Sequence, residues 1–429
     1  MSQDLLNINN PDPFVGSGEL IFAGCFTGLE YTYPKTLPAG CYLVQSFPGI
    51  RYSPLDNNKS QILGNAISVT YGFSSHLFLK IDETRLTFYP SWKLLSSGNA
   101  YPITTGTGGP TTNTIYDGTN IMWFGHNFTL GTSALRLSTD GITWTTRSVG
   151  SNAIPNTIAS GQISFVYNAS VTNKYIIGFS TTSTTNNIAY STDGVTWSLT
   201  GYTVTSQAGA VSFAINPNVT QKYVAIDRSS SNISNIISST DGVTWTSRNS
   251  GFAQFKRCLA TNGGNSGEVY VYTQDNTNQI GTSTDGITWT TRTTGGINNG
   301  CAIAYFDNKW VLTYITANSV IATSTDAITW THTTMDDQLT TSSTAQFTLS
   351  ANSRLFINTP TSDALVFSTN GTTWKSFIIG FSSGSQNTHG LHYINNKYIA
   401  FLGSTLQIFF EPDAQYVAVY RIDKEVGVV

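Results

Sequence analysis

The chain has few charged residues. Asp, Glu, Lys and Arg together make up 10% of its 429 residues, well below the roughly 25% of ordinary soluble domains. Lys and Arg number 21 against 24 Asp and Glu, and no basic run occurs, whereas nucleic-acid-binding proteins carry a basic stripe that displaces counterions from phosphate. We therefore expect no nucleic acid among the partners and a polar surface made mainly of Thr, Ser, Asn and Gly.

Long apolar runs are also missing. No apolar stretch approaches the roughly 18 residues that cross a bilayer as a helix, so no membrane span is expected. Residues 1–10 lack the basic segment and apolar core of a secretory signal peptide. The four cysteines, Cys25, Cys41, Cys258 and Cys301, are too few for a disulfide scaffold. Cys25 and Cys41 are candidates for one disulfide, although we expect reduced thiols in a chain without an export signal.

A seven-residue segment recurs six times along the chain, and we call each copy a box. The first box reads Ser138-Thr139-Asp140-Gly141-Ile142-Thr143-Trp144, and the later ones begin at Ser191, Ser239, Ser283, Ser324 and Ser368. Successive starts lie 53, 48, 44, 41 and 44 residues apart, close to the roughly 40–45 residues of a four-stranded propeller blade. With 39% hydrophobic and 12% aromatic residues available for a core, the sequence predicts an all-β protein whose main part is a β-propeller.

Each box predicts a two-residue hairpin turn. Gly adopts a positive φ without a Cβ clash, and the preceding Asp carboxylate accepts hydrogen bonds from turn amides. Because side chains alternate along a strand, we expect Ile142 and Trp144 to share one face, with the Trp packed between neighbouring sheets. Ala327 replaces the Gly of the fifth box and predicts a different turn there.

Structural roles in the repeat, and no catalytic roles, are therefore predicted for the key positions of the boxes. These residues are Asp140, Gly141, Trp144, Asp193, Gly194, Trp197, Asp241, Gly242, Trp245, Asp285, Gly286, Trp289, Asp326, Trp330, Asn370, Gly371 and Trp374. Asn370 stands where the other boxes have Asp, and it still tolerates the left-handed region and bonds locally.

A second motif recurs upstream of each box. It reads Asn173-Lys174-Tyr175, Gln221-Lys222-Tyr223, Asn308-Lys309-Trp310 and Asn396-Lys397-Tyr398, with looser copies at 120–123, 268–271 and 354–357. Seven copies predict seven blades, with six or eight as alternatives. The last unit, about 385–422, would contain strands at 390–395, 397–402, 406–410 and 416–421, with Glu411-Pro412-Asp413-Ala414 in place of a box. Atypical terminal repeats are usual.

Composition changes near the start of the chain, since eight of the thirteen prolines lie between Pro11 and Pro102. We expect a small β-module for attachment at 1–100 and a linker rich in Thr, Gly and Pro at 101–112. The propeller would then span 113–422, followed by a short tail at 423–429. In an alternative, residues 67–97 form a degenerate eighth blade, because Trp92-Lys93 resembles Trp374-Lys375 of the sixth box.

The candidate residues outside the boxes form no convincing metal-binding or catalytic pattern. His389 and His392 resemble a metal pair, but positions i and i+3 of a strand point to opposite faces, so no metal is expected. Asp336 and Asp337 have oxygen ligands suited to Ca²⁺, although a solvated acidic loop is the favoured interpretation. No nucleophile elbow, phosphate-binding loop or zinc pattern occurs. We therefore expect no cofactor.

The boxes resemble the Asp-box, Ser-x-Asp-x-Gly-x-Thr-Trp, of the sialidase and BNR-repeat propellers, in a version one residue shorter, over about residues 112–380. This resemblance implies the fold and a structural hairpin on the blade rim. Sialidase activity would also need an arginine triad, a Tyr–Glu pair and an acid/base Asp, and the family's Arg-Ile-Pro signature is absent. Arg147, Arg248 and Arg292 each follow a box Trp by three residues, which makes them repeat-surface positions.

The shortened boxes, the Thr/Ser/Asn-rich repeats and the Pro-rich start also resemble structural proteins of tailed bacteriophages. This implies a non-enzymatic virion protein, assembled in the host cytoplasm and multimeric on the particle, such as a tail fibre or receptor-binding component used in host attachment. Its partners would be other virion proteins and a host-surface glycan or protein. The alternatives are a sialidase-like glycoside hydrolase and a capsid decoration or tail nozzle protein. Carboxylates and arginines converging on the propeller axis would favour the hydrolase.

Overall fold

A computed structural model describes most of the chain. The described residues are 19–26, 31–32, 35–38, 40–47, 50–54, 75–81, 86–90, 93–99, 114–127, 132–147, 158–181, 187–203, 210–228, 234–248, 256–264, 266–274, 277–296, 298, 300–314, 320–334, 347–350, 354–358, 364–378, 388–395, 397–402, 405–410 and 415–422. Their regular elements are all strands, and none of these segments is a helix able to span a bilayer. The predicted linker, the tail and Asp336-Asp337 lie outside these residues.

The chain divides into two compact units. Unit 1 comprises Met1–Leu95, Phe377–Ser382 and Phe409–Val429, and unit 2 comprises Ser96–Ser376 and Ser383–Ile408. The described strands of unit 1 form a four-stranded sheet, β1-β35-β3-β5, and a three-stranded sheet, β2-β6-β4. Their bounds are β1 (Glu19–Phe26), β2 (Tyr31–Thr32), β3 (Gly40–Phe47), β4 (Ile50–Pro54), β5 (Ser75–Ile81), β6 (Leu86–Pro90) and β35 (Gln415–Ile422).

The last strand of the chain belongs to unit 1. β35 runs antiparallel between β1 and β3, with Ala418 opposite both Ala23 and Gln45. Placing residues 416–421 in the last propeller unit was therefore wrong, as was the boundary of the propeller at residue 422. The alternating pattern shows that a strand is half buried, but it does not show which sheet that strand joins.

The described strands form seven further four-stranded sheets, which lie mainly in unit 2 and are numbered here in chain order. Sheet 1 contains β8 (Thr114–Tyr116), β9 (Ile121–Asn127), β10 (Thr132–Ser138) and β11 (Thr145–Arg147); sheet 2 contains β12 (Ile158–Tyr167), β13 (Tyr175–Thr181), β14 (Ile188–Ser191) and β15 (Ser198–Leu199); sheet 3 contains β16 (Ala210–Ile215), β17 (Tyr223–Arg228), β18 (Ser234–Ser239) and β19 (Thr246–Arg248); sheet 4 contains β20 (Lys256–Thr261), β21 (Tyr270–Gln274), β22 (Gln279–Ser283) and β23 (Thr290–Thr293).

The remaining three sheets follow the same order. Sheet 5 contains β24 (Gly300–Phe306), β25 (Lys309–Tyr314), β26 (Val320–Ser324) and β27 (Thr331–Thr334); sheet 6 contains β28 (Phe347–Ser350), β29 (Arg354–Asn358), β30 (Ala364–Ser368) and β31 (Trp374–Ile378); sheet 7 contains β32 (Thr388–Ile394), β33 (Lys397–Leu402), β34 (Thr405–Phe410) and β7 (Lys93–Asn99).

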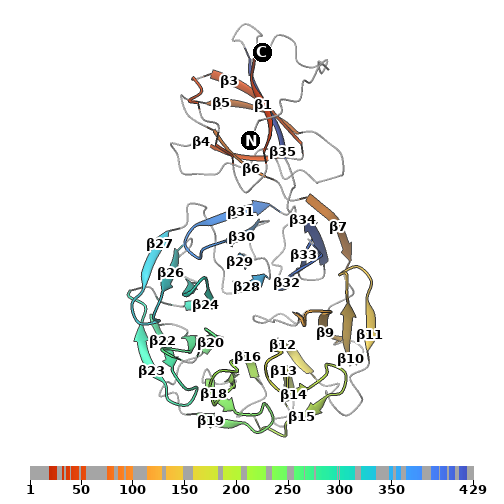
Figure 1. Cartoon of the computed structure of the whole chain (residues 1–429), viewed down its shortest axis with the longest axis vertical. Coiled ribbons are helices and arrows are strands. Elements are labelled where there is room, and N and C mark those ends of the chain that lie inside the picture. Colours follow the sequence, from red (N-terminus) through yellow and green to blue (C-terminus); the bar gives the residue numbers. More distant parts are fainter. Residues whose placement is uncertain are drawn as a thin grey trace. The chain divides into compact units, whose positions relative to one another are not determined.

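The seven sheets close into a ring. The first strands of successive sheets contact one another in the cycle β8, β12, β16, β20, β24, β28, β32 and back to β8. Figure 1 shows first strands such as β16 and β28 inside the ring and last strands such as β19 and β27 on its rim. Radially repeated antiparallel sheets around an axis define a β-propeller, as predicted.

Sheet 7 takes its last strand from the other end of the sequence. The order β32-β33-β34-β7 places β7 where β31 stands in sheet 6. Lys93 and Lys375 thus belong to the equivalent last strands of sheets 7 and 6. An eighth blade does not form from the described part of 67–97, because β5 pairs with β3 and β6 pairs with β2 and β4.

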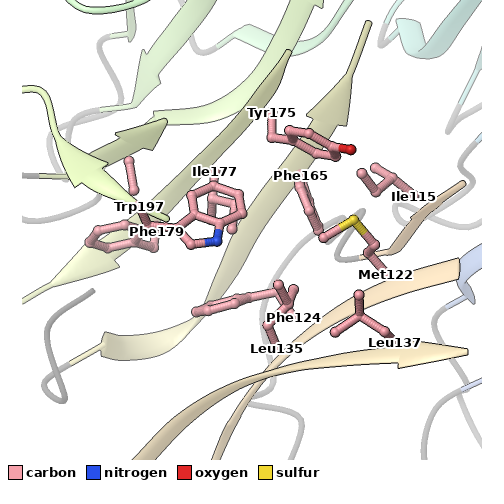
Figure 2. Close-up of a cluster of buried hydrophobic side chains, with 11 residues drawn as sticks. Ile115, Met122, Phe124, Leu135, Leu137, Phe165, Tyr175, Ile177, Phe179 and Trp197 are labelled. Carbon is pink, nitrogen blue, oxygen red and sulfur yellow. The ribbon is translucent and has the colours of Figure 1, made fainter. Parts of the chain in front are cut away.

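The hydrophobic core lies between neighbouring sheets. One cluster combines Met122, Phe124 and Leu135 of sheet 1 with Phe165 and Trp197 of sheet 2, and Figure 2 shows these side chains facing one another. Similar clusters fill the next interfaces, from sheets 2 and 3 to sheets 5 and 6. A single blade has no buried face of its own, so the ring is stabilised by stacking neighbours.

Candidate functional site

The six boxes form the same hydrogen-bonded turn on the ring. In the first box, Ser138 Oγ accepts the amides of Asp140 (3.3 Å) and Gly141 (2.8 Å) and donates to Asp140 Oδ1 (2.9 Å). Asp140 Oδ1 also accepts the amides of Ile142 (2.7 Å) and Thr143 (2.8 Å). The other five boxes contain the equivalent bonds.

This turn is longer than the predicted two-residue hairpin. In sheet 1, β10 ends at Ser138 and β11 begins only at Thr145. The residues between them bond to the Ser and Asp side chains rather than to the facing strand, so an Asx-type turn replaces the tight hairpin. The Asp side chain has the role that the sequence suggested, while the turn type was wrong.

The hydrogen bonds shift the titration of the box carboxylates. Burial opposes ionisation of Asp140, but the amides of Thr143 and Ile142 and the Ser138 hydroxyl outweigh it and lower its pKa to about 2. The amides of Thr196 and Val195 likewise lower the pKa of Asp193. Bonds to the ionised form favour that form, so these carboxylates are charged acceptors committed to the turn.

The box glycine faces the preceding sheet. Gly141 has a φ of 74°, and a Cβ there would meet Ile399 of sheet 7. A Cβ on Gly371 would lie 3.1 Å from Val311 of sheet 5. The glycine thus supplies both the left-handed backbone and a close approach between sheets.

Ala327 adopts the same conformation as the glycines. Its φ is 60°, Ser324 Oγ accepts its amide at 2.8 Å, and the residue is fully buried beside Val271 and other apolar residues of sheets 4 and 5. The expectation of a different turn in the fifth box was wrong. The Ser324 and Asp326 hydrogen bonds over-determine the turn, so it tolerates a left-handed residue that costs about 1–2 kcal/mol.

Five of the box tryptophans, Trp197, Trp245, Trp289, Trp330 and Trp374, pack in the apolar clusters between their own sheet and the preceding one, with unequal burial. Trp197 is 6% exposed and Trp245 9%, and Trp245 makes edge contacts with Phe213 and Tyr223, at 5.9 and 6.3 Å between ring centroids. The other four, Trp144, Trp289, Trp330 and Trp374, are only half buried.

The residue two before the tryptophan does not share its burial. Ile142 is 55% exposed, Val195 47% and Ile328 46%, so the expectation that Ile142 and Trp144 pack on one face was wrong. The residues from 139 to 144 lie in the turn and not in a strand. Strict alternation of side chains therefore does not apply to them.

The second motif forms hydrogen bonds between neighbouring sheets, a role that was not predicted from the sequence. Its tyrosine hydroxyls donate to the turn between the first two strands of the preceding sheet: Tyr175 to Asp117 Oδ2 (3.0 Å), Tyr223 to the Asn173 carbonyl (3.0 Å) and Tyr270 to the Gln221 carbonyl (2.7 Å). Burial raises the pKa of Tyr223 to about 12, although the Asn173 bond lowers it, so the hydroxyl stays a donor at neutral pH.

The same turns reach forward to the next box. Asn173 Nδ2 donates to the Asp241 carbonyl at 2.7 Å, and Lys309 Nζ donates to the Asn370 carbonyl at 2.9 Å. Boxes and second motifs thus interlock from sheet to sheet. The recurrence of an Asn-Lys-Tyr pattern at one strand position was the signal available in the sequence.

The three box-following arginines lie on rim strands. Arg147, Arg248 and Arg292 belong to β11, β19 and β23, the last strands of their sheets. Arg248 Nε donates to Ser238 Oγ at 2.7 Å, and Arg292 pairs with Glu268 at 3.0 Å. These arginines do not converge on the axis.

The remaining candidates are separated or outside the described residues. His392 Nε2 lies 2.9 Å from Thr114 Oγ1, between sheets 7 and 1, and burial lowers its pKa to about 4. Among the described residues no group of three His, Cys, Asp or Glu side chains is placed to hold a metal. Cys25 and Cys41 lie on the two strands that flank β35, opposite Tyr416 and Ile422. Two strand spacings, about 10 Å, and six residues along β35, about 20 Å, separate their backbones, which is too far for a disulfide.

Solved structures match this fold. No protein-family model and no curated protein matches the sequence. A catalytically inactive virginiamycin B lyase from Staphylococcus aureus, solved with quinupristin, has a TM-score of 0.53 at 14% identity, covering 77% of this chain and 100% of that one. A streptogramin B lyase structure gives 0.53 at 12%, covering 75% and 99%. A chain of the mitotic checkpoint complex gives 0.51 at 12%, covering 75% and 96%. These similarities confirm the β-propeller fold and, at such identities, extend no further.

Proposed function

We propose that this chain is a non-enzymatic bacteriophage virion protein, a tail or receptor-binding component whose propeller presents a recognition face. Its ligand would be a host-surface glycan or a neighbouring virion protein. The observation that carries the proposal is the use of the box carboxylates: each accepts two backbone amides of its own turn, as Asp140 does from Ile142 and Thr143. The repeat is thereby a scaffold that holds loops, and such scaffolds display binding residues on the loops that they position.

The chemistry of the rim supports recognition of a polar ligand. The last strands of four sheets consist almost entirely of Thr with Ser, Arg and His, as in Thr290–Thr293 and Thr331–Thr334, and most of these residues are exposed or half exposed. Hydroxyl and amide side chains form adaptable hydrogen bonds. With 10% charged residues in the chain, hydroxyl-rich ligands such as glycans suit this surface better than polyanions.

The connectivity supports unit 1 as the attachment module. Both ends of the chain belong to unit 1, and β35 completes its sheet. The first and last described strands, β1 and β35, thus belong to one sheet outside the propeller. A separate compact unit can carry attachment while the ring carries recognition.

The test is made on purified phage particles from a culture that produces the chain. Antibodies against the full chain should label the tail by electron microscopy, and the purified full chain should compete with particles for adsorption to host cells. Absence of the chain from particles would contradict the proposal. Release of sugar from host glycans by the pure chain would instead support the sialidase-like alternative.

A deletion series then separates the two units. Removing residues 1–100 would also remove β7 and open sheet 7, so the appropriate propeller variant begins at residue 91 and ends at residue 412. We expect this variant to compete for adsorption without being incorporated into particles. Incorporation of this variant into particles without competition for adsorption would show the opposite assignment, with the propeller as the attachment module.

A further inference from the structure

The sixth box differs from the others in the group that its turn holds. Asn370 replaces the Asp, and Gly371 follows it. Asn370 Oδ1 accepts the amides of Thr372 (2.9 Å) and Thr373 (2.8 Å). Ser368 Oγ accepts the Gly371 amide at 2.8 Å and donates to Asn370 Oδ1 at 3.2 Å. One serine therefore bridges a backbone N–H and the side-chain carbonyl next to it.

These contacts form the parts of an intramolecular acyl transfer. We propose that the sixth box deamidates itself, the Gly371 nitrogen attacking Asn370 Cγ to form a succinimide, with release of ammonia. Water then opens the succinimide and leaves an aspartate at position 370. Only water is consumed, and ammonia is the only group lost.

Ser368 provides the path for the proton. As the C–N bond forms, the Gly371 N–H proton passes to Ser368 Oγ, and the serine proton passes to Asn370 Oδ1. When the tetrahedral centre collapses, that proton and the electrons of the broken bond leave with the Nδ2 group as ammonia. The Thr372 and Thr373 amides are aimed at the oxygen that gains charge, the arrangement that stabilises such centres in acyl transfer.

The other boxes have the same geometry without the reactive group. In the fourth box, Ser283 Oγ accepts the Gly286 amide at 2.9 Å and donates to Asp285 Oδ1 at 3.0 Å. An ionised carboxylate is a poor electrophile, so this box is stable. The product in the sixth box would match the other five, with charge-assisted hydrogen bonds in place of neutral ones.

The chain offers an internal reference for the rate. Asn262-Gly263 is a second Asn–Gly pair, in which the Gly264 amide donates to Asn262 Oδ1 at 2.8 Å and the Gly263 amide to Thr261 Oγ1 at 3.1 Å. The folded full chain is aged at mildly alkaline pH and followed by peptide mass spectrometry. Asn370 should convert faster than Asn262, mainly to aspartate, and this advantage should vanish in denaturant.

Variants test the proton path through Ser368. Ser368→Ala should slow conversion at position 370 by about a hundredfold, the low end of a positioned proton transfer, and Ser368→Thr should restore much of it. Asp285→Asn should create a second converting box, whereas Asp326→Asn, which precedes Ala327, should convert far more slowly because of the added Cβ. These last two variants keep the test decisive should Ser368→Ala not fold. A stable Asn370 in the folded chain, a product that is mainly isoaspartate, or a stable Asp285→Asn box would overturn the proposal.

Discussion

At the scale of single residues, the box is a set of side chains with distinct tasks. Ser138 and Asp140 hold the turn, Gly141 makes the close approach to the preceding sheet, and Trp144 packs edge-on against Trp123 of its own sheet. The sequence was sufficient for the Asp hydrogen bonds and for the positive φ of the Gly, because both are local to the box. It did not predict the approach of Gly141 to Ile399. It was insufficient for Ile142, whose exposure depends on where β11 begins.

The burial of each box tryptophan should determine how much its replacement lowers the free energy of unfolding. Trp245→Ala should lower the free energy of unfolding by about 3–5 kcal/mol, since the removed ring leaves a cavity between sheets 2 and 3. Trp374→Ala, at a half-buried position, should cost less. Denaturant titration of both variants measures the difference, and equal costs would contradict the ranking.

The box carboxylate should make stability depend on pH. The pKa of Asp140 is lowered to about 2 in the fold, against about 3.9 in an unfolded chain. Its contribution is therefore complete above pH about 4 and is lost as the pH falls through about 2. Asp140→Asn should flatten this part of the stability curve while costing little at neutral pH, because Asn370 makes the same bonds. Unchanged acid sensitivity would show that Asp140 is not a source of it.

At the scale of elements, neighbouring sheets are coupled by turns. Each box packs on the preceding sheet, and the second motif supplies hydrogen bonds in both directions. In sheet 2, Tyr175 donates to Asp117 of the preceding sheet and Asn173 donates to Asp241 of the next one. The strands themselves were predictable from their apolar alternation. Their inter-sheet contacts were not predictable, because the sequence does not show to which carbonyl group a tyrosine hydroxyl will donate.

The Gly141 approach to Ile399 can be tested by a double-mutant cycle. Gly141→Ala should destabilise the ring, because a left-handed Ala costs about 1–2 kcal/mol and its Cβ meets Ile399 Cδ1. Ile399→Val removes that atom, so it should cost less in the Gly141→Ala background than in the original chain. Additive effects would show that the two residues do not share this contact.

At the scale of the whole molecule, each unit needs a strand from the distant end of the chain. β7 completes sheet 7, and β35 lies between β1 and β3. The expected division at residue 100 separated a module from a ring, whereas the strands cross that division twice. A strand from a distant part of the sequence removes the unpaired edge of the sheet that it completes. Such long-range pairing carries a larger loss of loop-closure entropy.

Two truncations test whether β7 protects the edge of sheet 7. Removal of residues 1–92 keeps β7 and should leave amide exchange in β34 (Thr405–Phe410) slow, while removal of residues 1–100 should accelerate it by exposing the edge of sheet 7. Hydrogen exchange followed by mass spectrometry reports both. Equal exchange in the two variants would mean that β7 does not protect β34.

The sequence by itself determined the repeat, the propeller and the hydrogen-bonded core of each box. These depend on the spacing of the tryptophans and on bonds between residues two or three apart, which few alternative conformations can make. Only the tertiary structure decided that β35 leaves the ring, that β7 closes it and that Ala327 keeps the common turn. An alternating pattern specifies a buried face but not a partner strand, and the strain at Ala327 is outweighed by Ser324 and Asp326.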